Sequence, residues 1–317
     1  MSAILVITGV ALLAVPGVVA SPAGRLRPDE WRRLNRAAIR LGSAMAALGL
    51  VAAAVPFALH ATGVDAMVDV CHHLLGPAAP GAAVVGGAGL GMSVALAAVA
   101  CSARWRSRRL QRSARIETCV GEHRCLTDAT LVVLPTDAVV AYATPGAPHQ
   151  VVISRGLVEA LESDELDAVV RHELTHLRNG HHRDLVLAGV VDATLGWLPG
   201  VRASTAALRL SLERSADEVA ADQPGARDAV RRALLKTTET ILGPVPAFAA
   251  AFSLVARLEA LETRAPDPTL RQRLLALTPL AGLTLVAAFG LLACTVLAHH
   301  SLLHLLGDCP LALHADA

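Results

Sequence analysis

The chain has 317 residues, of which 54% are hydrophobic and 17% are charged, and its mean hydropathy is +0.51. Soluble globular proteins average about 25% charged residues, so this composition excludes an ordinary soluble protein. It also excludes a disordered chain, which needs low hydropathy and high net charge. The net charge is only +1, so no overall positive field indicates nucleic-acid binding, and we expect no direct nucleic-acid partner.

The apolar residues are concentrated in uncharged runs that are long enough to cross a lipid bilayer, which takes about 20 residues. Four such runs occur, at residues 2–20, 41–60, 78–103 and 274–303. We therefore predict a multi-pass membrane protein with four transmembrane helices. Three of them, near residues 2–20, 41–60 and 80–103, belong to a membrane region over 1–115, and the fourth lies in 274–317 with a short extracytoplasmic tail.

Basic residues lie on one side of these runs only. Six Arg follow the first run in residues 21–40 and six follow the third run in residues 104–115, whereas 61–77 and 304–317 contain no Lys or Arg. Because basic segments stay on the cytoplasmic side, we predict that both termini lie outside a bacterial plasma membrane. The first run is less typical of a cleaved signal peptide, because no basic residue precedes it.

Residues 116–273 have the pattern of a folded domain, which this topology places in the cytoplasm. Residues 130–134, 139–143 and 149–154 have the composition of short strands, and they predict a small antiparallel sheet. From Leu157 onward the apolar spacing becomes helical. Ser163, Asp164 and Glu165 predict a helix start. The expected fold is therefore an α-helical membrane protein that carries an α+β domain.

The main functional motif, HExxH, lies on the helix that starts near Ser163. Its two histidines, His172 and His176, are four residues apart and so share one helix face, where both can bind one metal ion. Imidazole nitrogen suits zinc, and catalytic zinc sites take three protein ligands. Glu173 lies beside both ligands and can act as the general base.

The third ligand has two candidates, and His182 is the first. A His six residues after His176 fits the extended pattern HExxHxxGxxH. That pattern requires Gly where this chain has Asn179, and the same class needs a downstream Met, whereas no Met follows Met92. These departures make His182 the less favoured ligand.

The second candidate is Glu213, on a segment rich in Ala and Leu that we predict to be a helix over residues 206–222. Asp217 lies four residues further on the same face, where its carboxylate can orient a ligand histidine. The alternative is a solvated helix face on which Glu213 pairs with Arg209. Because HExxH requires a third ligand, we favour Glu213 as that ligand.

The motifs HELTH and LERSADEVAAD together resemble the Glu-zincin metallopeptidases over residues 120–265. Within this group the chain most resembles the BlaR/MecR-type integral-membrane peptidases, and the alternative is the HtpX/CAAX-protease type. The resemblance implies Zn²⁺ bound by His172, His176 and Glu213, with Glu173 as the catalytic base and Asp217 as the residue that orients a ligand. It also implies that the strand 149–154, with His149, Val151 and Ile153, is an edge that aligns an extended peptide substrate.

The resemblance implies a zinc endopeptidase that acts on a peptide or protein substrate at the cytoplasmic face of the membrane. For the BlaR/MecR type it implies regulatory proteolysis, with a cytoplasmic transcriptional repressor as the substrate. For the HtpX type it implies quality control of membrane proteins. A third hypothesis is a membrane signal transducer that keeps the zinc fold without catalysis.

Overall fold

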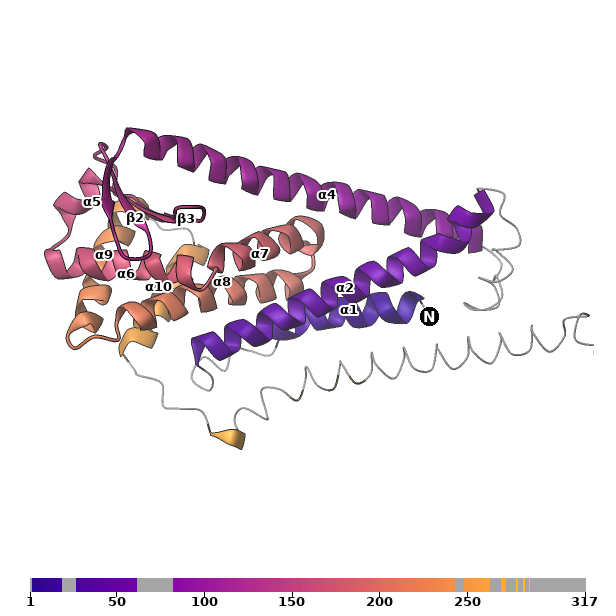
Figure 1. Ribbon diagram of the computed structural model, residues 1–317. Helices are drawn as coiled ribbons and strands as arrows, with labels where there is room; N and C mark the ends of the chain where they lie inside the picture. The colour runs from indigo at the N-terminus through magenta and orange to yellow at the C-terminus, as the bar shows by residue number, and fades with distance from the viewer. Residues whose placement is uncertain are drawn as a thin grey trace, which may run out of the picture.

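The computed structural model describes residues 2–18, 27–61, 82–242, 248–262 and 269–271, together with residues 278, 282 and 285. The fourth predicted membrane span, 274–303, falls almost entirely outside the described residues and stays a prediction. The described chain forms an N-terminal region of long helices joined to a domain with one small sheet (Figure 1).

Three helices form the N-terminal region: α1 (Ser2–Val18), α2 (Pro28–Ala61) and α4 (Ala82–Glu117). Among the described residues, two segments are long and apolar enough to cross a membrane, Pro28–Val55 and Gly86–Val120, while the apolar stretch of α1, Ala3–Gly17, is shorter. The two long segments overlap two of the four predicted spans. Each of α2 and α4 continues from its uncharged run into its basic segment without a break.

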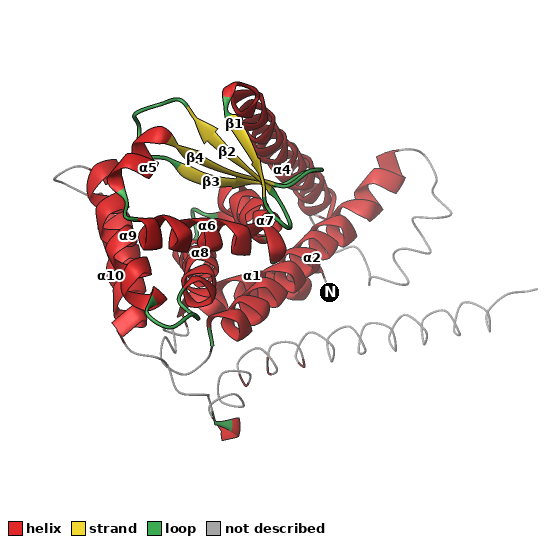
Figure 2. Cartoon of the chain, turned by 60° about the vertical axis from the view of Figure 1, so that its left-hand side comes forward, coloured by secondary structure: helices red, strands yellow, loops and turns green. Residues whose placement is uncertain are grey.

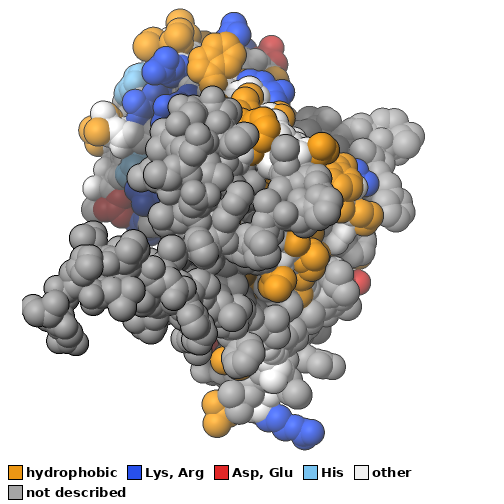
Figure 3. Space-filling model, turned by 90° about the vertical axis from the view of Figure 1, so that its right-hand side faces the viewer, with side chains coloured by type: hydrophobic (Ala, Val, Ile, Leu, Met, Phe, Trp, Pro, Cys, Tyr) orange, Lys and Arg blue, Asp and Glu red, His pale blue; other side chains and the backbone are white. Residues whose placement is uncertain are grey.

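The apolar half of α4 is poorly covered by the rest of the protein. Val84 and Val94 are 75% and 61% exposed, and Met92 is 53% exposed. Figure 3 views this end of the molecule, with hydrophobic side chains in the middle of the described surface and most of the visible Lys and Arg toward the top. An exposed apolar surface of this kind is expected for helices that face lipid.

Glycines allow α1 to pack closely on α2. A Cβ atom on Gly9 would lie 2.5 Å from the backbone nitrogen of Ala46, and one on Gly42 would lie 2.7 Å from the carbonyl oxygen of Gly9. At its other end α1 meets the domain, where the backbone N–H of Gly17 donates to Ser204 Oγ at 2.7 Å. Small residues at these crossings permit backbone approach that larger side chains would prevent.

The N-terminal helices also share a hydrophobic core with the domain. This core contains buried residues from α1, α2, α7 (His181–Leu195) and α8 (Pro199–Ala220), namely Leu13, Ile39, Ala188, Val191, Val201 and Leu208. Arg32 of α2 adds a buried ion pair with Asp184 of α7, with 3.3 Å between Nη1 and Oδ2. The two parts of the chain are therefore packed together rather than simply tethered.

The sheet has four strands: β1 (Glu122–Cys125), β2 (Thr130–Leu134), β3 (Ala141–Thr144) and β4 (Gln150–Ser154). They lie in the order β1-β2-β4-β3, and β2 and β4 are parallel while the other two pairs are antiparallel. The prediction of an antiparallel sheet was therefore wrong. The chain crosses over between β2 and β3, so that β4 returns between them and runs parallel to β2.

The strand that we predicted as the substrate-aligning edge is not at an edge of the sheet. β4 lies inside the sheet, between β2 and β3, and Val151, Val152 and Ile153 are each no more than 2% exposed. His149 precedes β4 and accepts a hydrogen bond from the backbone N–H of Gly146 in the preceding turn. An apolar run without alternation is typical of a strand that is buried on both faces. The edge strand on this side of the sheet is β3.

The helices of the domain cover the sheet and each other in layers (Figure 2). α6 (Ser163–Arg178) lies between the sheet and α8, and a core of buried residues that includes Val151, Ile153, Leu157 and Leu177 joins the sheet to α6. The remaining helices are α5 (Arg155–Ala160), α7, α9 (Ala226–Leu242) and α10 (Phe248–Glu262). A short 3₁₀ turn, Thr118–Val120, links α4 to β1.

Local interactions fix the two ends of α6. At its start the backbone N–H of Glu162 donates to Glu165 Oε2 at 3.0 Å, and the Glu165 side chain also pairs with Lys236 of α9. At its end Gly180 has a φ of +63°, a left-handed conformation that favours glycine. This turn lets α7 begin at His181, directly after the helix that carries the HExxH motif.

Candidate active site

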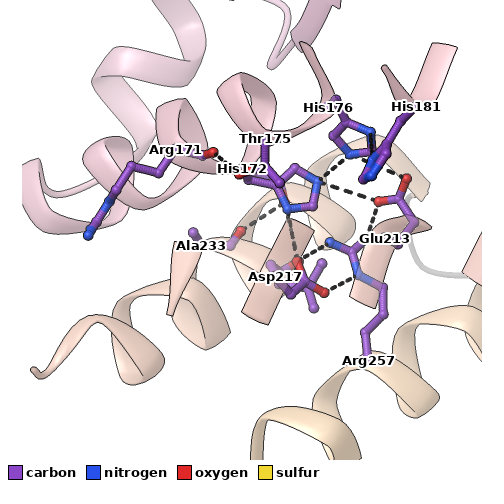
Figure 4. A network of polar contacts seen from close by, with 11 residues as sticks. Arg171, His172, Thr175, His176, His181, Glu213, Asp217, Ala233 and Arg257 are labelled. Atoms are coloured by element: carbon purple, nitrogen blue, oxygen red, sulfur yellow. Dashed lines mark hydrogen bonds and ion pairs between the residues drawn. The ribbon is translucent and has the colours of Figure 1, made fainter. Parts of the chain in front are cut away.

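The two histidines of the motif lie one turn apart on α6, with 3.1 Å between their Nε2 atoms. Glu213 reaches the same point from α8, and its carboxylate oxygens lie 3.5 Å from His172 Nε2 and 3.7 Å from His176 Nε2 (Figure 4). The antiparallel return of α7 and α8 brings Glu213 back over α6. Residues that are 37 positions apart in the sequence therefore meet at one point.

These three side chains have the donor types and separations of a zinc site. One ligand atom from each lies within 4.8 Å of the others, and among the described residues this is the only such group of three. Zinc ligands lie 2.0–2.2 Å from the ion in a tetrahedron, which places neighbouring ligand atoms roughly 3.3 Å apart. The two histidine nitrogens are 3.1 Å apart and lie 3.5 and 3.7 Å from different oxygens of Glu213, so the three side chains could hold a zinc ion after a small shift of the carboxylate.

Asp217 holds the other nitrogen of the first ligand. Its Oδ1 lies 2.9 Å from His172 Nδ1, and its side chain is only 4% exposed. Arg257 of α10 binds both carboxylate oxygens of Asp217, at 2.7 and 2.8 Å, and also lies 3.2 Å from Glu213. A bidentate guanidinium fixes a carboxylate firmly, so Arg257 and Asp217 together fix the ring of His172.

A third histidine supports the second ligand. His181 is fully buried, and its Nδ1 lies 3.0 Å from Nδ1 of His176 (Figure 4). When Nε2 of His176 binds a metal ion, its Nδ1 is protonated and donates a hydrogen bond to Nδ1 of His181. Burial is the main cause that lowers the pKa of His181, to about 3, so its ring stays neutral and can accept this bond.

The charges of the site are strongly coupled. Burial lowers the pKa of His172, but hydrogen bonds to Asp217 and Glu213 outweigh burial and raise the pKa to about 10. Burial also lowers the pKa of His176, to about 4, aided by the neighbouring His172. The pKa of Glu213 falls to about 2, because the hydrogen bond to His172 outweighs burial. A metal ion held at Nε2 of His172 would replace the proton there, so its binding would release a proton.

Glu173 opens onto a cleft beside the ligands. A cavity of about 310 Å³ is lined by His172, Glu173 and Glu213 together with residues of α9 and α10. Burial raises the pKa of the Glu173 carboxyl above its ordinary value, which suits a group that accepts and returns a proton near neutral pH. A second part of the cleft is lined by β3, through Ala141 and Ala143.

A model of peptidase family M48 matches residues 104–281, which is more than half of the chain. The chain belongs to peptidase family M48. This membership confirms the prediction of a protease.

Named relatives of this M48 chain are similar over short segments only. The chain is 38% identical over 68 residues to "Protease HtpX homolog" of Thermococcus kodakarensis and 35% identical over 69 residues to the protein of that name from Gemmatimonas aurantiaca. These alignments cover 21% of this chain and 22% and 24% of the two relatives. The chain thus spans less than a quarter of each relative. No solved structure matches it.

Most of the predicted site residues of this M48 chain meet at one point, and three do not. His172, Glu173, His176, Glu213 and Asp217 surround the cleft. His149, Val151 and Ile153 line neither part of it. The alternative ligand, His182, borders the cleft but is not in the group of three possible ligands.

The prediction from the sequence favoured a surface position for His181 over a role in tuning the site, and it gave Arg257 no defined role there. Arg257 comes from a helix 40 residues beyond Asp217, and only its place in an apolar helical pattern set it apart in the sequence. His181 directly follows Gly180. A glycine at this position allows a left-handed turn that ends one helix and starts the next in a new direction. Gly180 was therefore the sequence signal that could have placed His181 beside His176.

Proposed function

We propose that this M48 peptidase is a zinc-dependent endopeptidase that is anchored in a membrane and cleaves peptide bonds at the cytoplasmic face. The observation that carries the proposal is the meeting of His172, His176 and Glu213 beside Glu173 in an open cleft. Zn²⁺ held by these three side chains would supply a Lewis acid that polarises water and the peptide carbonyl.

The side chains of the chain move the proton and hold the ligands. Glu173 accepts a proton from the attacking water and returns it to the amine of the departing peptide. Burial raises the pKa of this carboxyl, which makes it a stronger base than an exposed glutamate. Asp217 and Arg257 keep His172 in the tautomer whose Nε2 faces the cleft, and His181 does the same for His176.

The strand that aligns the substrate in this proposal is β3 instead of β4. β3 forms the end of the sheet, and its Ala141 and Ala143 line the cleft beside His172 and Glu173. An extended peptide can add to such an edge through main-chain hydrogen bonds, with little dependence on its sequence. The small alanine side chains leave room for the side chains of the peptide, which supports a broad substrate class.

Two alternative cellular roles are compatible with this activity. We place the HtpX type first, because the relatives reported above carry that name. In that form the substrates are damaged membrane proteins, as the resemblance implies. In the BlaR/MecR-type alternative the substrate is a cytoplasmic repressor, and a gene for a small winged-helix repressor beside this one would favour it.

The test uses the full chain in a neutral detergent, with an unfolded protein such as β-casein as substrate. We expect cleavage that a chelator abolishes and zinc restores. Glu173→Gln is expected to bind zinc with the stoichiometry of the parent but to cleave about 10²- to 10⁴-fold more slowly. The matched control is Glu159→Gln, which changes an exposed glutamate on α5 and is expected to cleave at the parent rate.

Two results would contradict the proposal. Equal cleavage by Glu173→Gln and the parent would remove Glu173 from the mechanism. A parent chain that binds one zinc ion but cleaves neither β-casein nor co-expressed membrane proteins would favour the non-catalytic transducer.

A further inference from the structure

A second polar cavity lies outside the catalytic cleft, between α2, α4 and α7. Its volume is about 410 Å³, and four arginines line it: Arg40 of α2, Arg104 and Arg108 of α4, and Arg183 of α7. The apolar side chains of Val186 and Val190 form part of the same wall. Four arginines from three helices thus line one cavity that also has an apolar side.

The described residues that line this basic cavity supply positive charge without a carboxylate among them. No Asp or Glu is among the described residues that line the cavity. Nearby arginines differ in this respect, because Arg32 and Arg36 lie 3.3 and 3.6 Å from the buried carboxylate of Asp184. Several arginines around one cavity, with no carboxylate among its described lining residues, suit an anion with several oxygen acceptors, such as a phosphate.

The basic cavity lies where the charged and uncharged parts of the helices meet. Arg40 is the last charged residue before the uncharged run 41–60, and Arg104 is the first after the run 78–103. If these runs cross the bilayer, both arginines lie at the level of the lipid headgroups. Basic pockets between membrane helices on the cytoplasmic side commonly bind the headgroups of anionic lipids.

The general preference for cytoplasmic arginine does not account for this arrangement. Orientation in the membrane depends on the number of basic residues and not on the helix face they occupy. The polar residues of α4 that line the cavity, Arg104, Ser107, Arg108 and Gln111, follow a spacing of 0, 3, 4 and 7 and share one face. Arg106 and Arg109 lie roughly 200° and 140° round the helix from Arg104 and do not line the cavity.

We propose that the basic cavity binds the phosphate group of an anionic membrane lipid, with the acyl chains along the apolar side chains of α7. The inference rests on the membrane anchoring in the proposed function and does not depend on peptidase activity. His182 borders both the basic cavity and the catalytic cleft. A bound lipid would therefore lie next to the wall of the active site.

The experiment is native mass spectrometry of the full chain in a neutral detergent, with phosphatidylglycerol titrated in. Phosphatidylcholine serves as the zwitterionic control lipid, and glycerol 3-phosphate serves as the soluble phosphate. The test variant is Arg104→Gln/Arg108→Gln. The matched control is Arg106→Gln/Arg109→Gln, which removes the same charge from the opposite face of the same helix. Zinc content and the thermal unfolding midpoint show whether each variant is folded.

We expect the parent to bind phosphatidylglycerol in preference to phosphatidylcholine. Affinity should fall roughly 10- to 30-fold in Arg104→Gln/Arg108→Gln, because two charges are lost from the site, and should change less than threefold in the control. Equal losses in both variants, or equal affinity for the two lipids, would overturn the site. Saturation by glycerol 3-phosphate with the affinity of the lipid would overturn the lipid as the ligand.

If Arg104→Gln/Arg108→Gln fails to fold, Arg183→Gln on α7 tests the same cavity from another helix. Because lipid binding is measured without a substrate, a failed peptidase assay leaves this result intact. Conversely, cleavage of β-casein by a chain that binds no anionic lipid would refute the basic cavity alone.

Discussion

The catalytic cleft and the basic cavity are both polar, but their charges are balanced in opposite ways. In the cleft, three carboxylates, those of Glu173, Glu213 and Asp217, accompany two cations, Arg257 and His172 with its raised pKa. In the basic cavity, four arginines line a wall on which the described residues place no carboxylate. The surplus of negative charge suits a cation, and the surplus of positive charge suits an anion. The balance of charge within a cavity thus indicates its ligand better than its polarity does.

The largest effect on zinc affinity is expected from a substitution that removes negative charge from the cleft. Glu213→Gln replaces a charged ligand by a neutral amide that binds zinc poorly. We expect zinc affinity to fall more than about 100-fold and cleavage to become undetectable without added zinc. The measurements are zinc competition with a chelator and cleavage of β-casein. Binding of phosphatidylglycerol should not change, and a parallel loss would show that the two cavities are not independent.

A smaller effect is expected when the carboxylate behind His172 is removed. Asp217→Ala leaves His172 Nδ1 without its partner and leaves Arg257 beside Glu213 alone. Loss of such an outer partner typically costs 10- to 100-fold in metal affinity or activity. The control is Glu218→Ala, the adjacent exposed carboxylate on α8. An Asp217→Ala protein with the zinc affinity of the control would show that Arg257 alone can position the site.

His181, which contacts His176, is expected to contribute less to zinc affinity than Asp217 does, because its side chain is a neutral imidazole and not a carboxylate. His181→Leu removes the acceptor for Nδ1 of His176, and we expect zinc affinity to fall about 10-fold. His181→Asn offers an amide oxygen in a similar place and should recover most of that loss. If the Leu and Asn variants bind zinc equally well, His181 acts through packing alone. Circular dichroism checks that both variants are folded.

The smallest effect on zinc affinity is expected from substitution of Glu165, which should instead lower the free energy of unfolding. Burial raises the pKa of this carboxyl, but contacts with Lys236, the Glu162 N–H and Arg232 outweigh burial and hold the pKa below the ordinary value of 4.5. Stability from this group is therefore present above about pH 4.5 and lost as pH falls through the lowered pKa. Glu165→Gln should cost about 2 kcal/mol at pH 7, since its partners are half-exposed.

The measurement is urea unfolding of the parent and of Glu165→Gln at pH 7 and pH 3. The difference between the two proteins should be smaller at pH 3 than at pH 7, because stability from the ionised carboxylate is lost as pH falls toward its lowered pKa. A constant difference at both values would show that the cost comes from packing and not from charge. Glu159→Gln, which is exposed, should show no difference at either pH.

The motif residues could be predicted from the sequence because local spacing determines their geometry. His172 and His176 share a face on any helix, and Glu213 and Asp217 share a face on another. The sheet order could not be predicted in this way, because strand neighbours depend on the path of the chain between β2 and β3. The continuous apolar run of β4 was nevertheless a signal for an interior strand, and the prediction of an edge overlooked it.

The residues that contact the candidate metal ligands could not be predicted from the sequence for a different reason. Arg257 and His181 act through partners that come close only after α7, α8 and α10 have packed. A lone arginine or histidine in a helical pattern carries no sign of such a partner. The basic cavity is similar, because the arginines were visible as two clusters while their convergence with Arg183 depends on the packing of α7 against α4.

The core that α1 and α2 share with α7 and α8 makes the folding of the peptidase domain depend on the N-terminal helices. Leu13 and Ile39 cover Val201 and Leu208 on the helix that supplies Glu213. A chain shortened to begin at residue 116 would expose that face to water and would lose the pairing of Arg32 with Asp184. We therefore expect the peptidase half to lose the intact geometry of its active site when it is separated from α1 and α2.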